Sequence, residues 1–299
     1  MIKVPYTQNI ADDYYTLIAQ RKMPRYGNRT FESYYNQYIK KQKMDGIELR
    51  ELLCGSYERL VEIKDTIGTK YRSKTNIIKQ LFNYDKRKGK IVKFQPKISK
   101  YFEEKVEVHT CYYCNIEFIN TFKKSNGKSK NGFTLDHYID KATYPFLSLS
   151  LYNLIPSCNI CNSKVKSIKE IKSISPSSEQ FDFDDKVKFT TLVANSNLEI
   201  AYEKDIDLFL EEFFSEDYRE YIDVLMLNER YAYHKYKVIE LINKRKAYPD
   251  TRIRELAELT QKTEEEVKQD IFGEYIPNTL HKRPLSKLIK DISSELGLT

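Results

Sequence analysis

The sequence predicts a mainly helical α+β fold in which a small central β/α module carries a metal site. Apolar residues recur every three to four positions through residues 29–84 and again through most of the last third of the chain, as amphipathic helices require. Short segments rich in β-forming residues lie between these two parts. Two CxxC pairs, which begin at Cys111 and Cys158, bracket this middle part. These three observations favour helical regions on both sides of a metal-bearing centre.

The N-terminal region is predicted to be helical. Residues 29–84 contain three segments with helical spacing, and the basic run 86–90 is expected to form a turn. Pro96 begins a further segment that leads into the first CxxC pair.

The centre is predicted to contain two strands, at 115–122 and 133–139, that flank the polar loop 123–132. The dipeptide Asn131-Gly132 at the end of this loop is a strong turn signal. Helical character returns directly after the second CxxC pair.

The C-terminal part is predicted to begin with a hairpin over 188–202, with its turn at 195–197. Amphipathic helices are expected at 205–214 and 219–246. Thr263 and Glu266 have the spacing of a capping box for a helix over 264–272, and a last helix is expected near the C-terminus. The Ser/Pro-containing stretch 173–179 separates this part from the centre.

We therefore expect a helical N-terminal region over residues 1–104, a metal-bearing module over 105–172 and a mainly helical C-terminal region over 180–299. The chain has 299 residues, of which 40% are hydrophobic and 31% charged, enough for substantial cores. Neither a signal-peptide core nor an apolar run of about 18 residues occurs, so we expect a cytoplasmic protein that does not associate with membranes.

Charge is unevenly distributed along the chain, whose net charge is +7. Residues 71–100 hold ten Lys or Arg and one acidic residue, whereas residues 202–230 hold ten acidic residues and three basic ones. A basic block near a candidate site is typical of nucleic-acid binding, although a solvated helix face or loop gives the same pattern.

Four of the five cysteines form the two CxxC pairs: Cys111, Cys114, Cys158 and Cys161. In a reducing compartment this pattern favours a metal over disulfides. Two tight turns with two thiolates each complete a tetrahedron around zinc, and four protein ligands leave no open position. We therefore expect a structural Zn²⁺, whereas the solitary Cys54 is expected to be a core residue.

The segment between the two pairs holds Asp136, His137 and Asn153, and Asn162 follows the last cysteine. Asp136 and His137 are neighbours in a predicted strand, so their side chains should leave it on opposite sides. The zinc would hold the start of the helix at Asn162 close to this strand. A second, hard cation then fits between the oxygens of Asp136 and Asn162, and His137 could deprotonate a water molecule near it. The simpler alternative is a surface histidine beside a capping aspartate.

The segment from Cys111 to about Lys166 resembles HNH endonucleases with the ββα-metal fold. The resemblance lies in the order and spacing of CYYC, LDHYIDK, YNLIPSC, CNICN and SKVK, and it covers about a fifth of the chain. Asn162 stands where many members have histidine, and several members share this asparagine, including the HNH domain of CRISPR effector nucleases. Asp140 departs from the pattern, because relatives often have proline there; it would lie near the scissile phosphate or face solvent.

The resemblance implies a role for each motif residue. His137 would be the general base, and Asp136 and Asn162 would ligate one Mg²⁺ or Mn²⁺. Asn153 would orient the loop that carries His137 through backbone hydrogen bonds. Lys141, Lys164 and Lys166 lie beside the motif and would contact flanking phosphates, or else be solvated.

The leading hypothesis is a metal-dependent DNA endonuclease. Its resemblance to HNH nucleases of bacterial antiphage defence implies an ATPase or sensor protein as a partner. Two alternatives stay open: a non-catalytic zinc-knuckle protein that binds DNA or RNA, and an HNH nuclease that cleaves RNA or tRNA.

Overall fold

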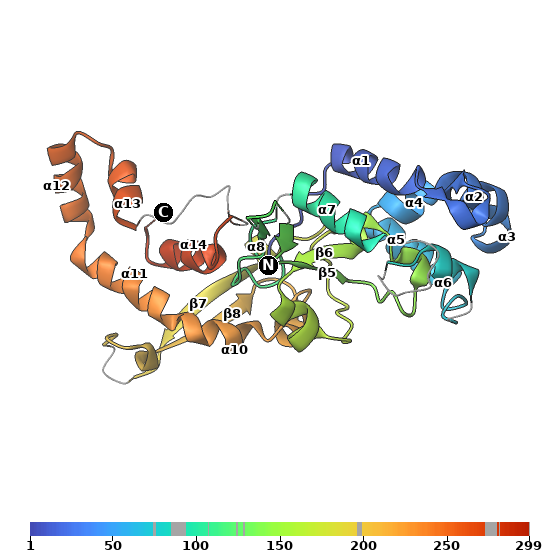
Figure 1. Cartoon of the computed structure of the whole chain (residues 1–299). Helices are drawn as coiled ribbons and strands as arrows, with labels where there is room; N and C mark the ends of the chain where they lie inside the picture. Colours follow the sequence, from blue (N-terminus) through green and yellow to red (C-terminus); the bar gives the residue numbers. More distant parts are fainter. Residues whose placement is uncertain are drawn as a thin grey trace.

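The chain is a mainly helical α+β protein, as the sequence predicts, and its computed structural model describes residues 1–73, 76–84, 94–106, 108–123, 125–127, 129–195, 199–272, 280 and 282–298. Figure 1 shows an elongated molecule with the N-terminal helices at one end and α11 to α13 at the other. Strands β5 and β6 lie near the middle. Within the described residues, strands pair as two-stranded antiparallel sheets.

Helices dominate the N-terminal region. They are α1 (Gln8–Ala19), α2 (Phe31–Tyr38), α3 (Lys40–Lys43), α4 (Leu49–Cys54), α5 (Tyr57–Ile67), α6 (Ile77–Leu81) and α7 (Gln95–Lys105), with the short strands β1 (Lys22–Met23) and β2 (Arg29–Thr30) and the 3₁₀ turn η1 (Pro24–Tyr26) after α1. Side-chain oxygens accept hydrogen bonds from amides of the first turn in several of them, namely from Thr7 in α1, Thr30 in α2, Ser56 in α5 and Asn76 in α6. Such caps satisfy amides that would otherwise lack a partner inside the helix. The predicted turn at 86–90 lies outside the described residues.

The central part contains most of the predicted site. Its elements are β3 (Thr121–Lys123), β4 (Ser129–Asn131), β5 (Thr134–His137), η2 (Pro145–Leu147), η3 (Leu151–Asn153), β6 (Leu154–Ser157) and the π-helix η4 (Ile160–Lys166). Strand β3 pairs with β4, and β5 pairs with β6. The strand predicted at 133–139 is present as β5, which ends at His137. The strand predicted at 115–122 is wrong for most of its length, because β3 begins only at Thr121 and pairs with β4, inside the segment predicted to be a loop.

The C-terminal region packs helices against a long hairpin. Its elements are α8 (Phe183–Lys186), β7 (Val187–Val193), η5 (Glu203–Asp205), β8 (Ile206–Glu212), α9 (Arg219–Val224), α10 (Leu227–Tyr231), η6 (Ala232–His234), α11 (Lys235–Ala247), α12 (Asp250–Thr260), α13 (Glu264–Phe272) and α14 (Ser286–Glu295). Helix α14 contacts β7, and α10 contacts β8. The capping box predicted for α13 is confirmed, because Thr263 Oγ1 accepts from the Glu266 amide at 3.2 Å and Glu266 Oε2 accepts from the Thr263 amide at 2.8 Å.

The prediction for 188–214 is wrong in one respect. The second strand of the hairpin is β8 and not 198–202, and β8 replaces most of the helix predicted at 205–214. The burial pattern explains the difference: Ile206, Leu208 and Leu210 are buried and alternate with more exposed residues. This period of two matches a strand with one face on a core. Residues 196 and 197 of the predicted turn lie outside the described part of the chain.

One cluster of buried side chains contains members from all three predicted regions, from Met1 to Ile292. A smaller cluster joins α12 and α13 to Leu298. The central module therefore shares its packing with the helical regions on both sides. Among the described residues, no helix has the length and apolar character needed to cross a membrane.

Candidate active site

The four cysteines of the CxxC pairs come together in the core. Cys111, Cys114, Cys158 and Cys161 are buried, and their sulfur atoms all lie within 4.8 Å of one another. A zinc ion with four bonds of about 2.3 Å places its sulfur ligands roughly 3.8 Å apart. The donor set and the spacing thus suit a structural metal such as zinc, as the sequence predicts.

Backbone amides support three of these sulfurs. The Cys158 amide donates a hydrogen bond to Cys111 Sγ at 3.3 Å, and the Cys161 amide donates to Cys158 Sγ at 3.3 Å. The Ile116 amide donates to Cys114 Sγ at 3.4 Å. N–H groups directed at sulfur stabilise the thiolate form, which is the form that binds a metal.

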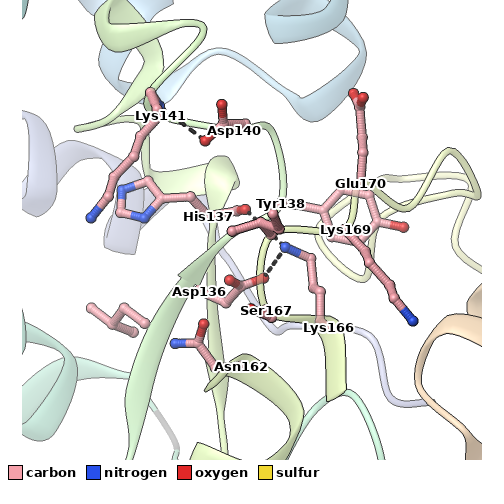
Figure 2. A pocket seen from close by; sticks show the side chains of 13 residues that line it. Asp136, His137, Tyr138, Asp140, Lys141, Asn162, Lys166, Ser167, Lys169 and Glu170 are labelled. Atoms are coloured by element: carbon pink, nitrogen blue, oxygen red, sulfur yellow. Dashed lines mark hydrogen bonds and ion pairs between the residues drawn. The ribbon is translucent and has the colours of Figure 1, made fainter. Parts of the chain in front are cut away.

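The cysteine cluster joins the elements that carry the polar residues of the motif. Strand β6 pairs with β5, placing Asp136 opposite Ile155 and His137 opposite Leu154, and then leads into the second CxxC pair. Helix η4 begins within that pair and carries Asn162. As a result, Asp136, His137 and Asn162 line one pocket of about 370 Å³. Figure 2 shows Asp136 and Asn162 on one side of this pocket and the His137 ring extending towards Lys141.

His137 is held in one orientation. Its side chain is buried, and Nε2 lies 2.9 Å from the carbonyl oxygen of Ser148. A carbonyl oxygen only accepts hydrogen bonds, so Nε2 carries the ring proton, and in the neutral ring the lone pair is on Nδ1. Tyr84 packs edge-on against the imidazole, with ring centroids 4.8 Å apart. The environment therefore selects the tautomer that has its basic nitrogen at Nδ1.

Asn153 binds the backbone of the segment that follows His137. It is fully buried; its Oδ1 accepts from the Ile139 amide at 2.6 Å, and its Nδ2 donates to the carbonyls of Ile139 and Leu147 at 3.0 Å each. These three bonds fix the two ends of the loop 139–147. The loop continues to Ser148, the partner of His137. Asn153 thus contacts backbone and does not line the pocket.

Asp136 is buried with a cation beside it. Its Oδ2 accepts a hydrogen bond from the Tyr113 hydroxyl at 2.6 Å and lies 2.9 Å from the Lys166 ammonium. Burial raises the pKa of the Asp136 carboxyl, and the charge of Lys166 opposes this shift. The Lys166 ammonium also lies 3.4 Å from the carbonyl oxygen of His137.

The oxygens of Asp136 and Asn162 suit a hard divalent cation. Asn162 Nδ2 donates to Thr134 Oγ1 at 3.0 Å, and Figure 2 shows the amide oxygen turned towards Asp136. Mg²⁺ sites commonly combine one or two carboxylates with water molecules and phosphate oxygens. One carboxylate and one amide oxygen match such a site, although the Lys166 ammonium already pairs with Oδ2 of this carboxylate.

The three lysines predicted to contact phosphates occupy different environments. Lys141 lies at the pocket, with its ammonium 5.0 Å from the centre of the Tyr84 ring. Lys164 is exposed on η4 and does not line the pocket. Lys166 is 4% exposed, so the alternative of a solvated side chain is wrong for this lysine. Contacts of these lysines with nucleic acid stay predictions.

Asp140, the residue that departs from the family pattern, caps a turn. Its carboxylate accepts from the amides of Ala142 at 3.0 Å and Thr143 at 2.9 Å. Although burial opposes it, hydrogen bonds from Thr143 and Ala142 hold the pKa of Asp140 below its usual value. Asp140 therefore fixes the chain beside Lys141 and also lines the pocket.

Sequence reasoning missed the residues that position the motif. Tyr84 and Ser148 contact His137. Tyr113 contacts Asp136, and Thr134 contacts Asn162. Tyr113 lies inside the first CxxC pair, and this position was its only available signal. Ser148 acts through its backbone carbonyl, which no side-chain pattern reveals.

Comparisons with protein-family models, with curated proteins and with solved structures each found no match to this chain. Function is therefore inferred from the motif and from the geometry of the pocket.

Proposed function

We propose that this chain is a metal-dependent HNH endonuclease that hydrolyses phosphodiester bonds in DNA. The observation that carries the proposal is the hydrogen bond between His137 Nε2 and the carbonyl of Ser148, in a pocket that also contains Asp136 and Asn162. A histidine whose outer nitrogen is protonated and oriented by a carbonyl presents Nδ1 as a base. A protein that only binds nucleic acid needs no such arrangement.

Each residue of the pocket has a task in this proposal. His137 Nδ1 takes a proton from the water molecule that attacks the phosphorus atom, and the P–O3′ bond breaks. Asp136 and Asn162 provide the oxygens for Mg²⁺ or Mn²⁺, which when bound neutralises charge on the phosphate and the departing oxygen. Asn153 and Ser148 keep the imidazole in place. Lys141, which lines the pocket, would contact a flanking phosphate.

Two further parts of the proposal rest on the motif resemblance alone. The chain would be the nuclease component of a bacterial antiphage defence system, and an ATPase or sensor protein would be its partner. Identification of proteins that co-purify with the chain tests both.

Plasmid cleavage tests the nuclease activity. We expect nicking that requires Mg²⁺ or Mn²⁺ and stops with EDTA. His137→Ala should lower the rate about 10²–10⁴-fold, as removal of a general base does, while its zinc content stays at the wild-type level. His234→Ala, outside the pocket, is the matched control and should cleave normally.

The outcomes separate the candidate functions. Wild-type cleavage by folded His137→Ala contradicts the assignment of the base. Tight DNA or RNA binding without cleavage under any divalent ion favours the non-catalytic zinc-knuckle protein. Cleavage of RNA or tRNA but not of DNA keeps the mechanism and changes the substrate.

A further inference from the structure

Arg230 connects the C-terminal region to both CxxC pairs. It lies on α10, and its guanidinium donates from Nη1 to Cys161 Sγ at 3.0 Å and from Nη2 to Cys114 Sγ at 3.3 Å. It thus reaches one sulfur of each pair. Nothing in the sequence near Arg230 indicates this contact, because 69 and 116 residues separate it from the two cysteines.

The hydrogen bonds to sulfur show what Arg230 adds. Backbone amides reach Cys111, Cys114 and Cys158. Within the described residues, Cys161 Sγ accepts its N–H hydrogen bond from the side chain of Arg230. The guanidinium therefore completes a set in which each of the four sulfurs accepts at least one N–H.

Charge gives the second reason for this contact. Four thiolates around Zn²⁺ carry a net charge of −2, and an uncompensated charge in a buried place is costly. The planar fork of a guanidinium directs two N–H groups at two acceptors, which an ammonium does not do.

The position of Arg230 is fixed by its neighbours on α10. Tyr231 is buried and donates its hydroxyl to the carbonyl of Cys114 at 2.7 Å. Asn228 Oδ1 accepts from the Leu210 amide of β8 at 2.8 Å. Helix α10 is therefore held between the first CxxC pair and the C-terminal hairpin, so Arg230 meets the sulfurs from a supported backbone.

We propose that Arg230 is part of the metal centre, where it compensates the charge of the four thiolates and attaches the C-terminal region to both CxxC pairs. Cys161 directly precedes Asn162, so the same contact positions the start of η4. Arg230 is thus a positioning residue. The proposal does not depend on nuclease activity, because a zinc-knuckle binding protein would need the same compensation.

Release of zinc from the full chain tests the proposal. We measure the zinc content and the rate of zinc transfer to an excess of a chromogenic chelator for wild type, Arg230→Met and Arg230→Lys. Loss of a group that supports metal ligands typically weakens metal binding by about 10–100-fold. We expect release from Arg230→Met to be faster by about this factor and release from Arg230→Lys to be intermediate, since an ammonium restores the charge but reaches fewer sulfurs.

Arg219→Met is the matched control, because Arg219 is exposed on α9 in the same region. It should release zinc at the wild-type rate. Wild-type release by folded Arg230→Met overturns the proposal, and so does a wild-type chain that binds no zinc. If Arg230→Met does not fold, the lysine variant decides: faster release than wild type supports the proposal, and equal release overturns it.

Discussion

The ammonium of Lys166 lies 2.9 Å from Oδ2 of Asp136, and both side chains are almost completely buried. Lys166 and Asn162 are four residues apart on η4 and therefore lie on the same side of the helix. The π-helical turn ends directly after Lys166, where the Ser167 amide donates to the carbonyl of Asn162 at 3.1 Å. The helix that brings the amide of Asn162 to the pocket thus also brings the cation that neutralises Asp136.

Lys166→Met should strongly destabilise the protein. Removing one partner of a buried ion pair leaves the other charge unpaired, which typically costs about 3–5 kcal/mol. Denaturant unfolding of the zinc-loaded chain measures this loss. Lys164→Met, an exposed position on the same helix, should change the free energy of unfolding by no more than about 0.5 kcal/mol. Equal unfolding midpoints for the two variants would show that the ion pair does not form.

Asn153 and Asn162 should respond differently to replacement by alanine. Asn153→Ala leaves the buried amide and carbonyl of Ile139 without their side-chain partner, at about 1–3 kcal/mol for each unsatisfied group. The Leu147 carbonyl loses one hydrogen bond but keeps the one from the Ser150 amide. The side chain of Asn162 donates a hydrogen bond to Thr134 and is less buried. We therefore expect Asn153→Ala to lower stability by several kcal/mol, and Asn162→Ala to lower it by about 1 kcal/mol while abolishing metal-dependent cleavage.

Thermal unfolding and plasmid cleavage of the two variants distinguish these effects. If Asn162→Ala proves as unstable as Asn153→Ala, the amide of Asn162 stabilises the fold and is not primarily a metal ligand. If Asn153→Ala keeps wild-type stability, its three hydrogen bonds contribute less than their burial implies.

Removal of one zinc ligand should unfold the central module. Structural zinc contributes folding free energy directly, because its ligands are not assembled in the unfolded chain. We expect Cys158→Ala to lose the bound zinc and to show a lower thermal midpoint in circular dichroism. Cys54→Ala is the control: Cys54 lies outside the cluster and donates its thiol to the carbonyl of Ala11 at 3.2 Å. Full zinc content in Cys158→Ala would exclude the four-cysteine site.

The parts of this structure that the sequence predicted are those encoded by neighbouring residues. CxxC spacing identified the cysteine cluster, and the capping box at Thr263 located α13. The strand around Asp136 was recognised from its short β-rich pattern. The capping box and the strand act within a few residues, and the two CxxC pairs could be joined across 47 residues because four thiolates complete one zinc site.

Contacts between distant residues could not be predicted in this way. Tyr84 and His137 are separated by 53 positions in the printed sequence, and Lys166 is 30 positions from Asp136. The spacing of Lys166 marked it as a basic residue beside the motif, but only the path of η4 shows that its side chain points inward. The prediction of a helix in place of β8 was wrong for a related reason, because pairing with β7 determines that this segment forms a strand.

The ring of Tyr84 packs against the proposed base, so it should influence both the environment of His137 and the rate of cleavage. The two rings form an edge-to-face pair with a centroid distance of 4.8 Å, and the Lys141 ammonium lies 5.0 Å from the centre of the Tyr84 ring. Tyr84→Phe keeps both ring contacts, whereas Tyr84→Ala removes them. We expect Tyr84→Ala to cleave about tenfold more slowly, which corresponds to about 1.4 kcal/mol and lies within the range of a single aromatic pair.

Proton NMR provides a measurement that does not depend on activity, because the chain has only four histidines. Loss of the Tyr84 ring current should move the imidazole signals of His137 in Tyr84→Ala and leave them nearly unchanged in Tyr84→Phe. Tyr38→Ala is the control, since Tyr38 also carries a cation, Arg29, over its ring but packs against Tyr34. His137 signals that stay in place in Tyr84→Ala would show that the two rings are not in contact in solution, and a slower rate in that variant would then need another cause.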